Sequence, residues 1–148
     1  MAVDKSYVER NRAATNRMRA LVERLSDEEL SFRYGKNWTI SAALAHLAFW
    51  DLRVLHLLDA TERNGKLCAA EIDIAVNDIA LPLWAAIPPR EAARIAVEIA
   101  EALDARLENF PQSMLEEIYA FNERWVVRAL HRNGHLDAID AAMRLKLH

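Results

Sequence analysis

Hydrophobic positions recur at helical spacing along most of the 148-residue chain. Residues 4–25 mix apolar and charged positions and contain neither Gly nor Pro, which predicts an amphipathic first helix. A second helix is expected over residues 40–62, with Thr39 as its N-cap. At about 100° per residue, its apolar side chains form one stripe with His46 at the edge. The stripe consists of Ile40, Ala43, Leu44, Leu47, Trp50, Val54 and Leu58.

The connections before and after this second helix contain shorter elements. Ser26, with Glu29 three residues later, is a capping-box pattern, so a separate turn of helix is expected to begin there. The segment 64–77 is the least regular part of the chain and predicts a loop, with at most a short extended piece. Residues 77–86 favour a short helix that Pro88 ends.

Two further long helices complete the pattern. A third helix is expected over residues 89–109, with Pro89 in its first turn. The last helical pattern covers residues 113–146, begins with a second capping box at Ser113 and has a break near Asn122. Four long helices in a chain of this length predict an all-α fold, a four-helix bundle with a long connection between its second and third helices.

Composition supports a single domain over residues 1–148 and excludes several function classes. The chain is 53% hydrophobic with three Gly and four Pro, as expected for helices around one core. Its formal charge is −3 and it has no basic block, so no nucleic acid is expected as a partner. Because Asp51 and Arg53 interrupt the most apolar stretch, we expect no membrane span. The single Cys68 excludes an internal disulfide, which favours a cytoplasmic protein.

Three histidines are candidates for a metal site. His131 and His135 are four residues apart, so on a helix they lie one turn apart on one face and can converge on one ion. A third ligand must come from a facing helix, and His46 is the histidine placed to supply it. His56 lies on the opposite face of its helix and His148 is the last residue, so both are set aside. The alternative is that all three are ordinary histidines without a metal.

Charged residues near these histidines have two interpretations each. Arg128 and Arg132 fall on the same helical face as the pair of histidines. They are either solvated arginines or a clamp for the carboxylate of a substrate or cofactor. Asp51 falls within the apolar stripe, where an unpaired charge is costly, so we expect it to pair with an arginine. Binding of a metal by histidine is expected to weaken as the pH drops through about 6.5, because a protonated imidazole has no lone pair to donate.

Two sequence motifs resemble signatures of the DinB-like family. The stretch Trp38-Thr39-Ile40-Ser41-Ala42-Ala43-Leu44-Ala45-His46-Leu47-Ala48-Phe49-Trp50-Asp51 resembles the family's second helix, where a Trp and a hydroxyl cap precede the first histidine ligand. The stretch His131-Arg132-Asn133-Gly134-His135-Leu136-Asp137-Ala138-Ile139 is similar to its last-helix signature. The resemblance implies a four-helix bundle with a divalent metal on His46, His131 and His135. It also implies kinship with thiol-dependent S-transferases and mycothiol-dependent maleylpyruvate isomerases.

Three hypotheses for function follow from these observations. The first is a metal-dependent enzyme acting on a small molecule, a thiol-dependent S-transferase that uses a low-molecular-weight thiol. The others are a hydrolase with metal-activated water and a non-catalytic metal-binding bundle. The motif lacks the Glu that follows the first His in zinc peptidases, which disfavours peptidase chemistry. Among metals, zinc and nickel rank first, and iron and manganese also suit three imidazoles. Apolar residues beyond one stripe on the first and third long helices predict a homodimer.

Overall fold

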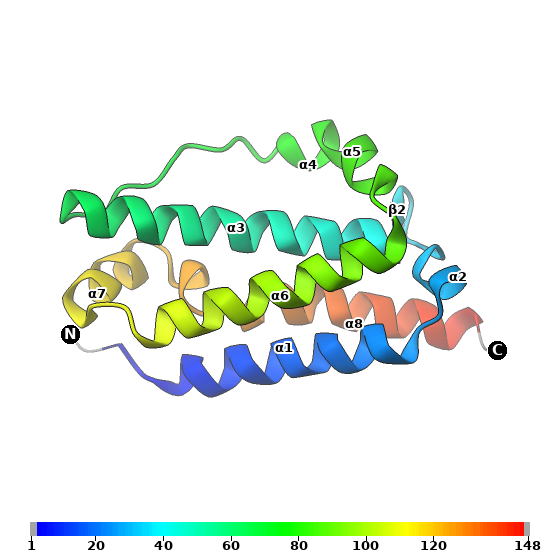
Figure 1. Ribbon diagram of the computed structural model, residues 1–148, viewed down its shortest axis with the longest axis horizontal. Helices are drawn as coiled ribbons and strands as arrows, with labels where there is room; N and C mark the ends of the chain where they lie inside the picture. Colours follow the sequence, from blue (N-terminus) through cyan, green and yellow to red (C-terminus); the bar gives the residue numbers. More distant parts are fainter. Residues whose placement is uncertain (1–2, 147–148) are drawn as a thin grey trace.

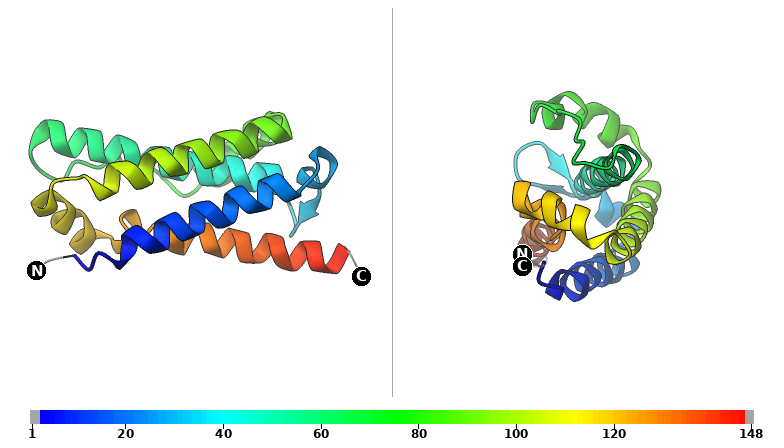
Figure 2. Two further views of the ribbon diagram at one scale, coloured as in Figure 1. Left: turned by 60° about the horizontal axis from the view of Figure 1, so that its bottom comes forward. Right: turned by 90° about the vertical axis from the view of Figure 1, so that its left-hand side faces the viewer.

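A computed structural model describes residues 3–146 and shows four long helices lying side by side (Figures 1 and 2). They are α1 (Ser6–Arg24), α3 (Ile40–Asn64), α6 (Pro89–Glu108) and α8 (Ala129–Lys146). Helix α3 packs along α6, and α1 packs against both α6 and α8. The structure is mostly helical, which confirms the predicted all-α class.

Shorter elements connect the long helices. The segment between α3 and α4 is a loop with no assigned strand among its described residues, and with α4 and α5 it runs along α3 (Figure 1). A two-stranded antiparallel hairpin, which the sequence did not predict, pairs Arg33 with Thr39 and Tyr34 with Trp38. The short elements are α2 (Asp27–Leu30), β1 (Arg33–Tyr34), β2 (Trp38–Thr39), α4 (Val76–Ile79), α5 (Leu81–Ala86), α7 (Gln112–Phe121) and the 3₁₀ helix η1 (Glu123–Trp125).

Side-chain caps mark the starts of α2 and α3, as the sequence predicted. The capping box at Ser26 is present, and the Thr39 hydroxyl accepts a hydrogen bond from the backbone N–H of Ala42 at the start of α3. The capping box predicted at Ser113 is wrong. Helix α7 begins one residue earlier, at Gln112 after Pro111, so Ser113 lies inside the first turn, where its hydroxyl cannot act as N-cap.

Two large apolar clusters form most of the core, a smaller third one packs α5 against α3 and α6, and a layer of buried polar residues lies between the two large clusters. One cluster joins α1, α2, α3, α6 and α8 near the hairpin, and the other joins the opposite halves of the long helices to α7. In the layer between them, Arg132 of α8 is fully buried and pairs with Asp51 of α3 and Asp104 of α6. Its guanidinium also donates to the Thr15 hydroxyl and to the Asn11 carbonyl of α1. This polar layer links all four long helices.

Helix α3 is the central helix of the molecule. It is the one helix among the described residues that is long and apolar enough to cross a membrane by length and composition alone, which by itself is weak evidence for a span. Moreover, 67% of its apolar stretch is buried inside the protein, as in the core helix of a soluble protein.

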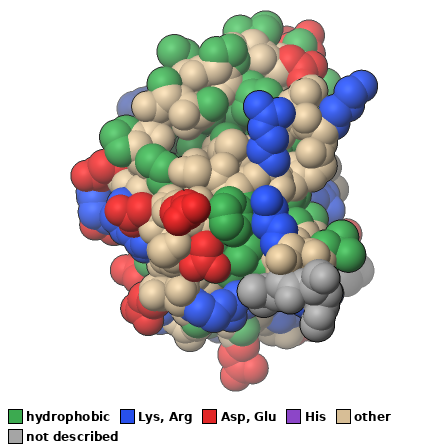
Figure 3. Space-filling model, turned by 90° about the vertical axis from the view of Figure 1, so that its right-hand side faces the viewer, with side chains coloured by type: hydrophobic (Ala, Val, Ile, Leu, Met, Phe, Trp, Pro, Cys, Tyr) green, Lys and Arg blue, Asp and Glu red, His purple; other side chains and the backbone are tan. Residues whose placement is uncertain are grey.

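The end of the molecule that carries the hairpin shows both basic and acidic side chains, so this face does not present one sign of charge (Figure 3).

Candidate metal centre

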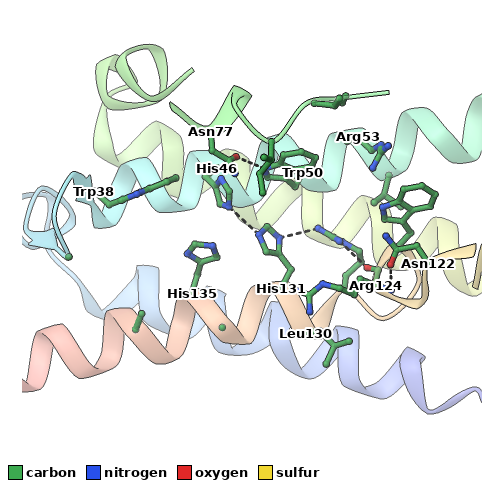
Figure 4. Close-up of a pocket in the computed structure, with 18 of the residues that line it drawn as sticks. Trp38, His46, Trp50, Arg53, Asn77, Asn122, Arg124, Leu130, His131 and His135 are labelled. Atoms are coloured by element: carbon green, nitrogen blue, oxygen red, sulfur yellow. Dashed lines mark hydrogen bonds between the residues drawn. The ribbon is translucent and has the colours of Figure 1, made fainter. Parts of the chain in front are cut away.

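Three histidines from two facing helices converge in the middle of the molecule. His46 extends from α3 toward His131 and His135, which lie one turn apart on α8 (Figure 4). One ring nitrogen from each residue lies within 4.8 Å of the other two. The Nε2 atoms of His46 and His131 are 3.1 Å apart. The structure therefore brings together the three histidines that the sequence singled out.

Burial keeps these imidazoles neutral. Desolvation, followed by the nearby His135 and Arg128, lowers the pKa of His46 to about 3. Desolvation and the positive charge of Arg128 lower the pKa of His131 to about 2, and burial also lowers the pKa of His135. Neutral imidazole is the form that donates a lone pair to a metal. Protons therefore compete for the nitrogens of His46 and His131 only well below pH 6.5, which corrects the expectation that binding weakens near that pH.

The outer ring nitrogens of the three histidines have different neighbours. The Tyr34 hydroxyl lies 3.1 Å from Nδ1 of His135 and can accept a hydrogen bond from the Nδ1–H, which leaves Nε2 free to bind a metal. Arg128 donates from Nη2 to Nδ1 of His131 over 3.2 Å, which places the proton of this neutral ring on Nε2, so a metal at Nε2 would require the proton to move to Nδ1 and Arg128 to release this contact. Among the described residues, the buried Nδ1 of His46 forms no hydrogen bond of normal geometry, although the Asn77 side chain lies close enough to offset part of the lowering of the His46 pKa. Trp38 packs edge-on against His46 and, together with Tyr34, brings the β1–β2 hairpin to the site.

The histidines line a cavity of about 900 Å³ between α3, α8 and the segments that connect the long helices. Its walls are largely aromatic and apolar, and the side chain of Trp50 is fixed by a hydrogen bond from Nε1 to Asn77 of α4 at 2.9 Å. None of the described residues that line the cavity is Asp or Glu. Three arginines line it instead, Arg53, Arg124 and Arg128. The site is thus an open, cationic pocket with three neutral nitrogen donors on one wall.

The donor set fits one divalent ion. Two nitrogens that are each about 2.05 Å from a tetrahedral ion lie about 3.3 Å apart, close to the observed separation of the His46 and His131 nitrogens. The three rings come from rigid helices, they are neutral, and the pocket leaves open space beside them. Three neutral protein ligands with room for a further one are typical of catalytic rather than structural zinc sites.

Comparison with known protein families matches residues 10–138 to the DinB superfamily. The chain belongs to the DinB superfamily. This family binds metals, and the cluster of His46, His131 and His135 in this DinB protein is compatible with such a site. No curated protein and no solved structure matches the chain. The family assignment therefore rests on a match that covers most of the chain, and the site assignment rests on geometry.

The two predicted arginines have different environments from those expected. Neither is solvated, because Arg128 is 4% exposed and Arg132 is fully buried. Arg128 donates to Asp51 through Nε over 2.9 Å and still lines the pocket, so it can face a ligand. Arg132 lies in the polar layer away from the pocket, which leaves it a structural role. The pairing of Asp51 with arginine is confirmed.

Other sequence assignments are resolved by position. His56 is exposed on α3, away from the cluster, as predicted. His148 lies outside the described residues, and Cys68 is an exposed free thiol. The sequence analysis missed Tyr34, because its hairpin depends on pairing between two very short strands. It also missed Arg53, although seven residues after His46 on one helix is two turns along the same face.

Proposed function

We propose that His46, His131 and His135 bind one divalent metal ion and that the protein is a metal-dependent enzyme acting on a small molecule. The observation that carries the proposal is the convergence of three neutral imidazoles on the wall of a cavity of about 900 Å³. In this proposal the four long helices are a four-helix bundle of the DinB kind, with the metal between α3 and α8. Zinc and nickel suit the site best, with iron and manganese next.

The reaction that we favour is transfer to a low-molecular-weight thiol. A bound divalent ion would supply a positive charge that lowers the pKa of a thiol or a water molecule beside it. The described pocket lining has no carboxylate that could serve as a general base for water. A thiol needs less help, because its ordinary pKa of about 8.5 is already close to neutrality. In the transfer the thiol proton goes to solvent, the sulfur forms a bond to carbon, and the leaving group departs with its electron pair.

The protein's own residues have separate parts in this proposal. Tyr34 holds the ring of His135, so that its inner nitrogen faces the pocket. Trp50, fixed by Asn77, forms an apolar wall that keeps the rest of a substrate away from bulk water. Arg128 is held by Asp51 and supplies a positive charge next to His131, which favours a substrate or thiol that carries a negative charge. The fixed cation disfavours a metal ion unless such an anion compensates for it.

The first test is metal binding by protein purified without a histidine tag. Replacing His46, His131 or His135 by Ala removes one of three ligands, so zinc affinity measured by calorimetry is expected to fall at least about 100-fold. The matched control is His56→Ala, which removes an exposed histidine from the same helix as His46 and should leave affinity unchanged. Equal affinity of His46→Ala and His56→Ala would contradict the site.

A second test separates transferase from hydrolase chemistry. The zinc-loaded protein is mixed with 1-chloro-2,4-dinitrobenzene and each of several low-molecular-weight thiols, and thioether formation is followed by absorbance. Turnover that requires both thiol and the three histidines supports the transferase. Hydrolysis of an activated ester without thiol supports the hydrolase instead, and metal binding with neither activity supports a non-catalytic bundle.

A further inference from the structure

Two arginines lie at one end of the pocket, Arg53 of α3 and Arg124 of η1. Among the described residues neither forms an ion pair, which is also true of several exposed arginines such as Arg63, so what sets these two apart is their place in the pocket. Both unpaired arginines line the cavity that contains the histidines. Figure 4 places them at the end of the pocket away from Trp38.

Arg53 is held in place and partly desolvated. Its Nη2 donates to the backbone carbonyl of Ala70 at 2.8 Å, and its guanidinium lies over the ring of Trp125 at 4.4 Å from the centroid. Its Nε is buried and has no hydrogen-bond partner. Burial and then the nearby charge of Arg128 lower the pKa of Arg53. Its Nη1 is not buried and forms no hydrogen bond among the described residues, so it is the donor open to a ligand in a pocket whose described lining has no carboxylate.

Arg124 adds a second cation to this end of the pocket. Its backbone N–H donates to the Asn122 side chain at 3.0 Å, which fixes the start of η1, and its exposed side chain forms no hydrogen bond within the described part of the chain, so it is free to move onto a ligand. Planar guanidinium groups match carboxylates, to which they donate two parallel hydrogen bonds. They bind phosphate in the same way, but the indole of Trp125 beside Arg53 offers an apolar surface that only an organic acid can use.

We propose that Arg53 and Arg124 bind the carboxylate of a small organic acid whose other end reaches the histidine cluster. This inference deepens the proposed function, because it names the class of substrate or thiol that the pocket takes. Arg53 follows His46 by seven residues on α3, so the two positions are about 10 Å apart along the helix. Trp50 lines the stretch between them and contacts an apolar or aromatic middle part of the ligand.

The test uses 3-phenylpropionate as the probe and its neutral amide, 3-phenylpropionamide, as the matched comparison. Each is titrated into the metal-free and the zinc-loaded protein by calorimetry. Charge-assisted hydrogen bonds to arginine are expected to make the acid bind at least about tenfold more tightly than the amide. Arg53→Gln and Arg124→Gln are each expected to reduce this preference at least about fivefold. Arg63→Gln, which removes an exposed arginine of the same helix outside the pocket, is expected to keep it.

Several outcomes would overturn the proposal. They are equal binding of acid and amide, no binding of the acid, an unchanged preference in both arginine variants, or binding of inorganic phosphate to these arginines in place of the acid. Because Arg53 also contacts the loop at Ala70, Arg124→Gln is the variant that cannot act through that loop. Loss of zinc binding with an intact preference for the acid would contradict the proposed function alone. Loss of the preference with intact zinc binding would contradict this inference alone.

Discussion

At the scale of single residues, position in the fold decides what each charged side chain does. Arg128 and Arg132 are four residues apart, which is about one helical turn. Arg128 faces the pocket, whereas Arg132 is fully buried in the polar layer. Helical spacing placed them on the face of the histidines, but it cannot distinguish a pocket wall from a buried layer. That distinction depends on Asp51 and Asp104, which come from other helices.

The lowered pKa values of the histidines predict that the metal-free protein loses stability in mild acid. In the unfolded chain these rings take up protons near pH 6.5, whereas folded His46 and His131 do so only at about 3 and about 2. Their contribution to stability is therefore fully present above pH 6.5 and decreases as the pH falls from there toward 3. Urea unfolding between pH 7.5 and 4.5 measures this dependence.

The matched variants for this experiment are His46→Gln and His56→Gln. Removing the buried ring should make the loss of stability with acid less steep, because one group that the unfolded chain protonates preferentially is gone. His56→Gln removes an exposed histidine, so it shows how much the pH dependence of stability changes when the chain only has one histidine fewer. The same pH dependence in wild type and His46→Gln would show that His46 does not titrate differently in the folded and unfolded chains.

At the scale of elements, the sequence predicted the long helices well because their signals are local. Apolar spacing, Thr39 as N-cap and Pro89 in the first turn act within one helix, and all three are as expected. The β1–β2 hairpin was missed because two strands of two residues each carry almost no periodic signal. Its turn uses Gly35 in the left-handed region, at φ 67°, and brings Tyr34 back against α8.

The polar layer between the helices predicts a large effect of one substitution. Asp51→Ala would leave the buried guanidiniums of Arg128 and Arg132 without a shared carboxylate, so unfolding is expected to become easier by about 3–5 kcal/mol. The control is Glu98→Ala, which breaks an exposed pair with Arg94 and should cost less than about 1 kcal/mol. Urea unfolding of both variants measures the difference. Similar small losses would show that the layer is not held by Asp51.

At the scale of the whole molecule, the homodimer was predicted from apolar residues expected on the surface of the first and third long helices, α1 and α6. The strongly exposed large apolar residues among those described include Leu52, Ile79 and Leu83, on α3, α4 and α5, and none lies on α1 or α6. The homodimer therefore stays a prediction without a mapped interface. A cytoplasmic location and the absence of nucleic-acid partners likewise stay predictions.

The separation of core and metal site predicts that the fold does not depend on the metal. Apolar clusters on both sides of the polar layer join the long helices, and the histidines contact the cavity at its edge. Protein stripped with a chelator should therefore keep its helical circular dichroism and unfold cooperatively, unlike a zinc finger. Adding zinc should raise the melting temperature, because a ligand that binds only the folded state stabilises it by mass action. The variant His131→Ala should melt at the same temperature with and without zinc. If the wild-type protein instead lost its helical signal on chelation, the metal would be structural.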